Sequence, residues 1–164
     1  MVDLGLTLSQ IGIYITMLGA FAALMGAGLA GLCLKVCSRA HTLLIFSLFK
    51  ILTLMGYAWL AFQYEAKAEI QHGLIYLINA AEDMISAMLL VVILTLVMQY
   101  SRKQFAGTDF TFQVAIMATV SGALYSISGI FADAFGYHIY LFSIVLIALG
   151  CLIPIFRWIE KKKK

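Results

Sequence analysis

The sequence predicts an all-α integral membrane protein with five transmembrane helices. Of the 164 residues, 63% are hydrophobic and only 12% are charged, and the mean hydropathy is +1.01. Soluble proteins average about 45–50% apolar and about 25% charged residues. Five apolar segments are each long enough for the hydrocarbon core of a bilayer, which takes about 20 helical residues to cross. These segments are 11–34, 42–62, 74–98, 110–132 and 139–156.

The segments are expected to be helices rather than strands. Inside a membrane the backbone has no water to bind, so only helices and closed barrels satisfy its polar groups. Barrel strands would alternate between apolar and polar residues over about 10 positions, whereas these segments are continuously apolar. Because the connections are short, we expect consecutive helices to be antiparallel neighbours, within one domain that covers residues 1–164.

Basic residues alternate between the connections and predict the orientation. Nine of the eleven Lys and Arg residues lie on one side of a five-pass arrangement, one lies on the other side, and Lys50 lies inside a span. Basic loops stay in the cytoplasm because their translocation is unfavourable. We therefore expect the N-terminus outside and the C-terminus inside. The nine residues are Lys35, Arg39, Arg102, Lys103, Arg157 and Lys161–Lys164.

These short basic clusters also indicate the partner, which is the lipid bilayer. They lie beside the spans, where they can contact anionic headgroups. They do not form the basic face that nucleic-acid binding requires. We expect no nucleic-acid partner.

Two segments carry small residues every four positions, a spacing that lets membrane helices approach closely. In the first segment these are Gly19, Ala23, Ala27 and Gly31, with Gly26 in a second stripe beside them; in the fourth they are Ala118, Gly122 and Ser126. We expect both helices to be buried in a bundle. The second and fifth segments are rich in Leu, Ile, Phe and Met, so we expect them to face lipid.

Aromatic residues flank two of the segments. Tyr57, Trp59 and Tyr64 lie near one end of the second segment, and Trp158 follows the fifth. Tyr and Trp are enriched at membrane interfaces. We interpret these four as anchors.

Ionisable residues inside spans are costly and are functional candidates. Three are present, Lys50, Glu82 and Asp83. Asn79, Asp83 and Ser86 share one face of the third segment, with Glu82 beside them, because residues three and four apart are neighbours on a helix. One hypothesis is that Glu82 or Asp83 lines a translocation pathway or takes part in proton coupling. The alternative places both near the outer mouth, in a hydrated local network.

The depth of Lys50 argues against a simple ion pair with Asp83. Lys50 lies about 12 Å from the cytoplasmic end of its helix and Asp83 about 22 Å from that end of its own, at 1.5 Å per residue. A Lys side chain does not comfortably bridge the difference. We expect Lys50 to extend toward the cytoplasmic interface instead.

Catalytic and metal-binding motifs are absent from the sequence, so we expect no enzyme, no cofactor and no metal. No H-E-x-x-H, G-x-S-x-G or phosphate loop occurs. An enzyme would need the Glu82–Asp83 pair to bind a divalent metal. Cys33, Cys37 and Cys151 do not have the number or spacing of a metal site or disulfide framework.

Two stretches resemble the end of a major facilitator superfamily permease, closest to the branch of muropeptide and siderophore permeases. The first is Phe105–Gln113 (FAGTDFTFQ), and the second is Ser128–Tyr137 (SGIFADAFGY). In that branch an A-G-T-D-F/Y-T-x-Q turn precedes the eleventh helix and a G-x-x-A-D-x-x-G-Y stretch leads into the twelfth. The matching positions are Gly107, Thr108, Asp109, Gln113, Asp133, Gly136 and Tyr137.

The start of the chain resembles the same family. Asp3–Gly12 (DLGLTLSQIG) is similar to the loop before the eighth helix, and Gly31–Arg39 (GLCLKVCSR) is similar to a degraded G-x-L-x-D-r-x-G-R loop. Gly31 and Arg39 match that loop, but its acidic residue and second Gly do not. The resemblance implies helices eight to twelve of a twelve-helix permease, which makes the third segment helix ten. The polar face of that segment, rather than a family motif, predicts that Asn79, Asp83 and Ser86 line the cavity.

From these features we expect the C-terminal part of a secondary-active permease of the bacterial inner membrane, moving a small organic solute. Transport by such permeases takes place between two six-helix halves. Five helices would therefore not transport alone and would need the N-terminal half as a partner. The alternative is a non-transporting membrane protein that assembles with another protein through its small-residue helix faces. Asp109, Asp133 and His138 lie in or beside loops and are expected to shape turns.

Overall fold

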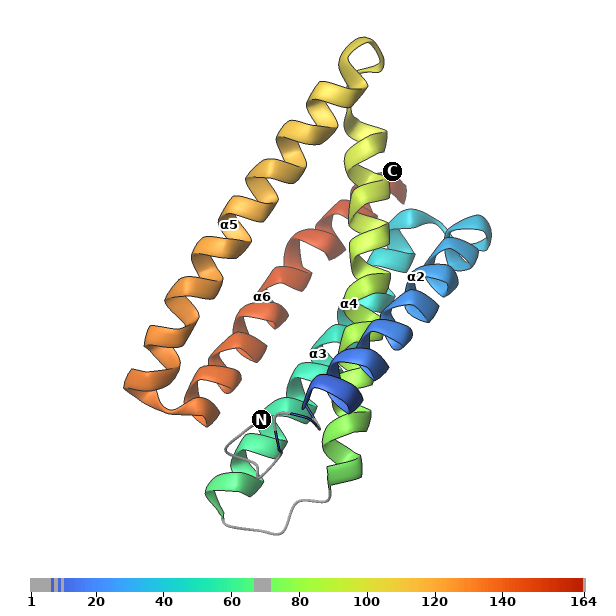
Figure 1. The fold of residues 1–164 in the computed structure, drawn as a ribbon. Coiled ribbons are helices and arrows are strands. Elements are labelled where there is room, and N and C mark those ends of the chain that lie inside the picture. Colours follow the sequence, from blue (N-terminus) through green and yellow to red (C-terminus); the bar gives the residue numbers. More distant parts are fainter. Residues whose placement is uncertain (1–6, 8, 10, 67–71, 164) are drawn as a thin grey trace.

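The computed structural model describes residues 7, 9, 11–66 and 72–163, and its described part is helical without strands. Its elements run in antiparallel order through one helical assembly (Figure 1). In chain order they are a π-helical segment η2 (Ile11–Met17), α2 (Leu18–Val36), α3 (Arg39–Glu65), α4 (His72–Tyr100), the 3-10 turn η3 (Lys103–Phe105), α5 (Ala106–Phe135) and α6 (Tyr137–Lys163).

The five predicted segments coincide with five helices that are long and apolar enough to cross a membrane. Most of these helices extend beyond the predicted boundaries, because a helix continues through the polar interface after the apolar core ends. The largest difference at a start is in α5, which begins at Ala106, inside the stretch expected to be a loop. Gly136 separates α5 from α6 with φ 84°, a left-handed conformation that favours glycine.

Helix α3 is the central element, and the expectation that it forms a lipid-facing wall holds for only one of its faces, where Leu48, Leu52 and Phe62 are exposed. It contributes to all three clusters of buried apolar residues, through Leu60, Phe46 and Ile51. The third cluster joins α3 to Val145 and Leu152 of α6. Lipid tails are as apolar as Leu, so an apolar helix surface is equally suited to lipid and to another helix. Composition therefore did not distinguish the two.

Two of the three main helix pairs are not consecutive in the chain. Helix α2 packs against α4, and α3 packs against α6 and α4, whereas α2 and α3 have little contact. The prediction that consecutive helices are neighbours is therefore wrong for α2 and α3. A short loop makes two consecutive helices antiparallel, but the shapes of the side chains determine which helices pack against each other.

The small residues of α2 explain its close packing on α4. Gly19, Gly26 and Ala30 are buried. A Cβ at Gly26 would lie 2.9 Å from Met84 Cγ and 3.0 Å from the Met84 carbonyl carbon. Ala23, Ala27 and Gly31 are partly buried, and Gly31 has open space where a Cβ would lie. Close backbone approach between α2 and α4 thus depends on the glycines at Gly19 and Gly26.

Helix α5 lies at the outside of the assembly, and the expectation that it is buried is wrong for this chain. Its most apolar stretch has no buried residue, and in Figure 1 it runs apart from α2 and α3. Ala118, Gly122 and Ser126 are all exposed, and a Cβ at Gly122 would meet nothing within 4 Å. Small residues permit close packing but supply no attraction that requires it.

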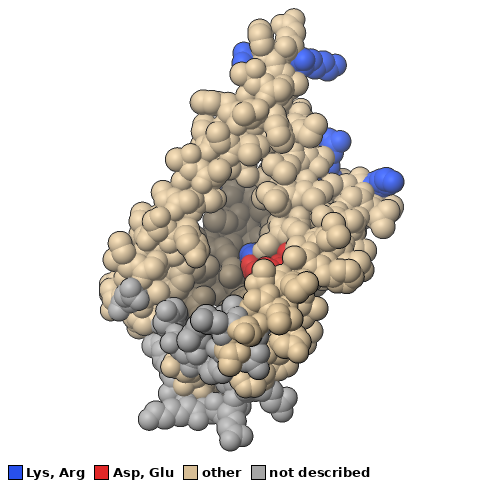
Figure 2. All heavy atoms as spheres, in the orientation of Figure 1, with Lys and Arg blue, Asp and Glu red and all other residues tan. Residues whose placement is uncertain are grey.

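The connections that carry basic residues lie at one end of the molecule. The α2–α3 connection, the α4–α5 connection and the end of α6 lie at the upper end in Figure 1, and most Lys and Arg atoms lie toward that end in Figure 2. The α5–α6 turn lies at the opposite end. The fold therefore groups the basic residues as a cytoplasmic face requires.

A thiol-labelling experiment tests the predicted orientation. Cys37 is exposed at the end of α2, in the basic part of the molecule. In a Cys33→Ala/Cys151→Ala background, a membrane-impermeant maleimide should label Cys37 only after the cells are opened. In the cysteine-free chain, His72→Cys at the start of α4 should be labelled from outside. Labelling of Cys37 in intact cells would contradict the orientation.

Candidate functional site

Polar side chains from α3 and α4 meet in the apolar part of the assembly. Helix α4 contributes four of them, on neighbouring faces over two turns. Helix α3 contributes two that are seven residues apart, which places them on one face two turns apart. The six residues are Asn79, Glu82, Asp83, Ser86, Lys50 and Tyr57.

Lys50 is the cation of this network. Its Nζ forms an ion pair with Glu82 Oε1 and donates a hydrogen bond to Ser86 Oγ at 2.5 Å. Ser86 Oγ in turn donates to the same Glu82 oxygen at 2.9 Å. The expectation that Lys50 extends toward the cytoplasmic interface is therefore wrong. Glu82 and Ser86 satisfy the ammonium locally, so the side chain does not need the interface.

Asp83 belongs to a second arm of the network. The Tyr57 hydroxyl donates to Asn79 Oδ1 at 3.0 Å, and Asn79 Nδ2 donates to Asp83 Oδ2 at 2.8 Å. Tyr57 was interpreted from the sequence as an interfacial anchor, but its hydroxyl has a partner inside the assembly. Its position seven residues after Lys50 is the sequence signal that could have placed it in the site.

Helix α2 closes the site at Gly19. A Cβ at this position would overlap the Asp83 carboxylate and lie 3.3 Å from Asn79 Nδ2. Gly19 is buried, so the space next to Asp83 is occupied by the α2 backbone rather than by a side chain. Three helices therefore hold the network, and a larger residue at Gly19 would displace the acidic group.

The charges of the site do not balance when all three groups are ionised. One ammonium faces two carboxylates, and the ammonium pairs with Glu82. Asp83 receives a hydrogen bond from the neutral Asn79 amide. An uncompensated carboxylate in an apolar region is costly. The arrangement is therefore suited to binding and releasing a positive charge at Asp83, because a bound cation or a proton there would remove the imbalance.

The network is accessible from one side. The Lys50 and Glu82 side chains keep 26% and 22% of their surface exposed. The space-filling view shows a hollow in the middle of the molecule, with acidic and basic atoms together at its edge (Figure 2). Among the described residues, Lys50, Glu82 and Asp83 are the charged residues in the middle of the spans. A solute in the hollow could reach them.

A separate set of contacts fixes the α4–α5 connection. Arg102 donates to Asp109 through its backbone N (3.0 Å), Nε (2.9 Å) and Nη2 (2.8 Å). These hydrogen bonds raise the pKa of the Arg102 guanidinium. Arg102 also lies over the Phe105 ring, and Arg39 donates to Gln99 nearby. Asp109 thus shapes this turn, in agreement with the interpretation of its position.

The other residues of the family-like stretches lie at the two ends of α5. Gly107, Thr108 and Gln113 are in its first turns, Asp133 is in its last turn, and Gly136 and Tyr137 form the junction with α6. The side chains of Asp133, Tyr137 and His138 are outside the described part of the structure. Among the described side chains of these stretches, none is hydrogen-bonded to the Lys50 network.

No metal site occurs among the residues that the structure describes, because no three His, Cys, Asp or Glu side chains come close enough. The three cysteines are free.

The five apolar helices define a multi-pass helical membrane protein. No family model matches this sequence, and no solved structure matches its fold. The family resemblance therefore remains an expectation from the sequence motifs.

Proposed function

We propose that this chain is part of a secondary-active permease of the bacterial inner membrane and contributes to moving a small organic solute. The observation that carries the proposal is the ion-paired and hydrogen-bonded network of Lys50, Glu82, Ser86, Asn79 and Asp83 inside membrane-spanning helices. Ionisable groups at membrane depth are costly and are retained for substrate or ion pathways. The sequence resemblance to permeases, described above, points in the same direction.

The proposed pathway needs more helices than this chain supplies. Permeases hold the solute between two repeated halves near the bilayer midplane. In this chain the charged network lies at the edge of an open hollow rather than in an enclosed cavity (Figure 2). Further helices, as the N-terminal half of the permease or as another protein, would enclose the hollow.

Solute uptake tests this proposal. The substrates to measure are a labelled muropeptide and a labelled ferric siderophore, in cells that express either the chain alone or the whole gene region. We expect uptake only with the whole region, and a loss of uptake of at least about tenfold for Lys50→Met. A hydrogen bond to a charged group contributes more than about 1.4 kcal/mol, which corresponds to a factor of ten.

The controls separate the two parts of the proposal. Lys35→Met, at the exposed end of α2, should leave uptake unchanged. Uptake by the chain alone as a monomer would contradict the need for further helices. Unchanged uptake in Lys50→Met would contradict the assignment of the pathway.

The second candidate is a non-transporting protein that assembles with a partner through α5. The exposed small-residue face of Ala118, Gly122 and Ser126 favours it, because the corresponding residues of α2 are largely used against α4. Crosslinking from Gly122 would discriminate. Crosslinks to a different membrane protein, without solute uptake by the whole gene region, would favour this second function.

A further inference from the structure

The hollow in the middle of the molecule is open on the side that Figure 2 shows. In the orientation shared by Figures 1 and 2 it lies between α5 and the pair formed by α2 and α4. Charged atoms lie at its edge, at a depth where lipid tails would otherwise fill the opening. Lipid tails do not solvate charge. The cover that fits is a further membrane-spanning helix, because a helix satisfies its own backbone in lipid.

The charges at this edge specify more about the covering helix. The Lys50 ammonium is already paired with Glu82. The Tyr57 hydroxyl donates to the Asn79 amide oxygen, which turns the amide NH₂ group toward Asp83, where it donates to Oδ2. Asp83 therefore has a neutral donor as its neighbour, and the site carries one carboxylate more than it has cations.

Among the described residues, no second cation can reach Asp83. Apart from Lys50, the Lys and Arg residues of the sequence lie in connections or near helix ends. Asp83 lies eleven residues after the start of α4 and seventeen before its end, about 17 Å and about 26 Å at 1.5 Å per residue. A Lys side chain, with its four-carbon stem, is shorter than either distance. The complementary cation has to come from a spanning helix of a partner, at the depth of Asp83.

The packing of α2 determines the side from which a partner can approach. A Cβ at Gly19 would lie 3.1 Å from the Asp83 carboxyl carbon, so the α2 backbone fills one side of this side chain. Asp83 is nevertheless only partly buried. A partner therefore approaches it from the hollow.

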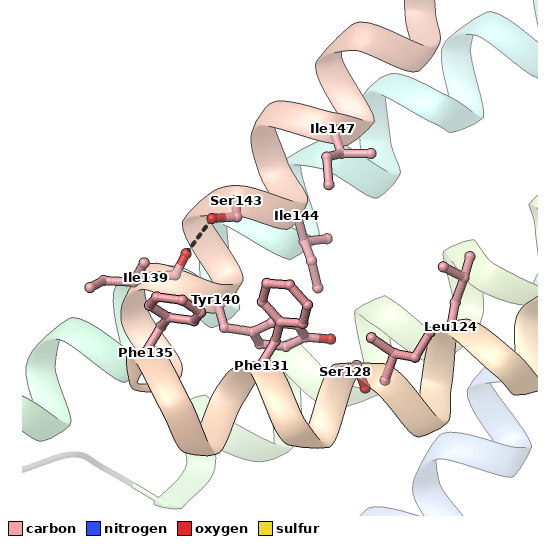
Figure 3. A pocket seen from close by; sticks show the side chains of 10 residues that line it. Leu124, Ser128, Phe131, Phe135, Ile139, Tyr140, Ser143, Ile144 and Ile147 are labelled. Atoms are coloured by element: carbon pink, nitrogen blue, oxygen red, sulfur yellow. Dashed lines mark hydrogen bonds between the residues drawn. The ribbon is translucent and has the colours of Figure 1, made fainter.

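The cleft between α5 and α6 is a second opening, but it specifies no partner. It measures about 560 Å³, and no residue of the Lys50 network lines it. Figure 3 shows its lining, which is mostly aliphatic and aromatic and carries no charged side chain. Its two serines donate to carbonyls of their own helices, Ser128 to Tyr125 and Ser143 to Ile139. Charge complementarity thus selects an occupant for the hollow and not for this cleft.

We infer that the hollow is a docking surface for a partner's membrane-spanning helix that carries a Lys or Arg side chain near its middle, and that this side chain pairs with Asp83. The inference rests on the proposed function only in its need for further helices. It adds the property by which such a helix is recognised. A wholly apolar helix could fill the hollow but would leave the Asp83 carboxylate without a cation.

Association with a synthetic transmembrane helix tests this inference on the full chain. The probe is a Leu- and Ala-rich peptide of about 23 residues with one central Lys, and the matched peptide has Met in its place. In phosphatidylcholine vesicles, energy transfer from a donor on Cys37, in the Cys33→Ala/Cys151→Ala background, to an acceptor on the peptide reports binding. We expect the Lys peptide to bind about five- to thirtyfold more tightly than the Met peptide, the effect of polar contacts between model transmembrane helices.

A pair of neutralising variants assigns the contact. Asp83→Asn removes the charge and keeps the size of the side chain, so it should abolish the preference for the Lys peptide. Glu160→Gln neutralises an exposed carboxylate near the end of α6 and should leave the preference unchanged. Far-UV circular dichroism verifies that each variant is folded, and the comparison of the two peptides on the wild-type site needs no variant.

Two results would overturn the inference. Equal binding of the Lys and Met peptides, or binding of neither, would show that Asp83 does not recruit a cationic helix, as when the carboxylate holds a proton instead. A preference for the Lys peptide that persists in Asp83→Asn would place the contact elsewhere. Solute uptake is measured without either peptide, so failure of the docking inference and failure of the proposed function are separate outcomes.

Discussion

Replacing Lys50 by Met will lower the free energy of unfolding by about 3 kcal/mol, the lower end of the range for breaking a buried ion pair. The substitution leaves Glu82 without its cation, and Ser86 alone cannot neutralise the carboxylate. We expect a loss at the lower end of that range because the Lys50 and Glu82 side chains keep 26% and 22% of their surface exposed. The measurement is unfolding in mixed detergent micelles, followed by far-UV circular dichroism.

The double variant Lys50→Met/Glu82→Leu is the decisive comparison. Removing both charges leaves no unpaired charge of this ion pair, and only the Ser86 hydroxyl loses its partners. Replacing an ion pair by apolar residues is often neutral or stabilising. We expect the double variant to recover to within about 1 kcal/mol of the wild type, a coupling that a double-mutant cycle measures directly. Lys35→Met, on the exposed end of α2, should change stability by less than about 0.5 kcal/mol.

The outcome that would contradict this account is simple additivity. If the two single substitutions each destabilise the protein and their effects add in the double variant, Lys50 and Glu82 do not act as a pair. Destabilisation by Glu82→Leu alone is expected to resemble that of Lys50→Met, because it leaves the ammonium without its carboxylate.

Replacing Gly26 by Leu is expected to destabilise the α2–α4 contact by about 1–3 kcal/mol, the usual cost of overpacking. A Cβ at this position already meets the Met84 backbone, with the carbonyl carbon at 3.0 Å. A backbone atom cannot rotate away as a side chain can. The two helices must therefore separate, and Ala30, which is fully buried with Phe46 and Val92, would lose part of its packing.

Gly28→Leu is the matched control for this substitution. Gly28 lies two residues further along the same helix, is exposed, and has nothing within 4 Å of a Cβ. Both substitutions replace glycine in a helix interior, so they share the same gain in helix propensity. Once the gain in helix propensity is subtracted, Gly28→Leu should change the free energy of unfolding by no more than about 0.5 kcal/mol in either direction. Equal effects at the two positions would contradict close packing at Gly26.

The spans could be predicted from the sequence, whereas their packing could not. Length and apolarity alone decide whether a segment can cross a bilayer, and α2 to α6 meet this condition. The packing of α3 at the centre depends on which apolar surface meets which. Since lipid and protein offer the same apolar environment, the Leu, Ile and Phe residues of α3 carried no signal of their neighbours.

The candidate site was predicted in part. The polar face of α4 follows from the helical period, which puts Asn79, Asp83 and Ser86 together. The partner of Lys50 was missed because the depth comparison assumed that α3 and α4 end at the same level. Helix α4 extends further than the start of α3 (Figure 1), and Glu82 and Ser86 bind the Lys50 ammonium. Tyr57 and Gly19 were missed as members of the site because their roles depend on α3 and α2 lying against α4.

The sequence by itself determined that this chain forms five membrane-spanning helices, because apolar length is a local property that each segment carries alone. It also determined that the basic residues alternate between connections, which the fold then groups at one end. Only the tertiary structure decided that Lys50 pairs with Glu82, that α3 is central and that α5 is left outside with an apolar cleft beside it. Those outcomes depend on shape complementarity between residues far apart in the chain, and shape is fixed only when the helices pack.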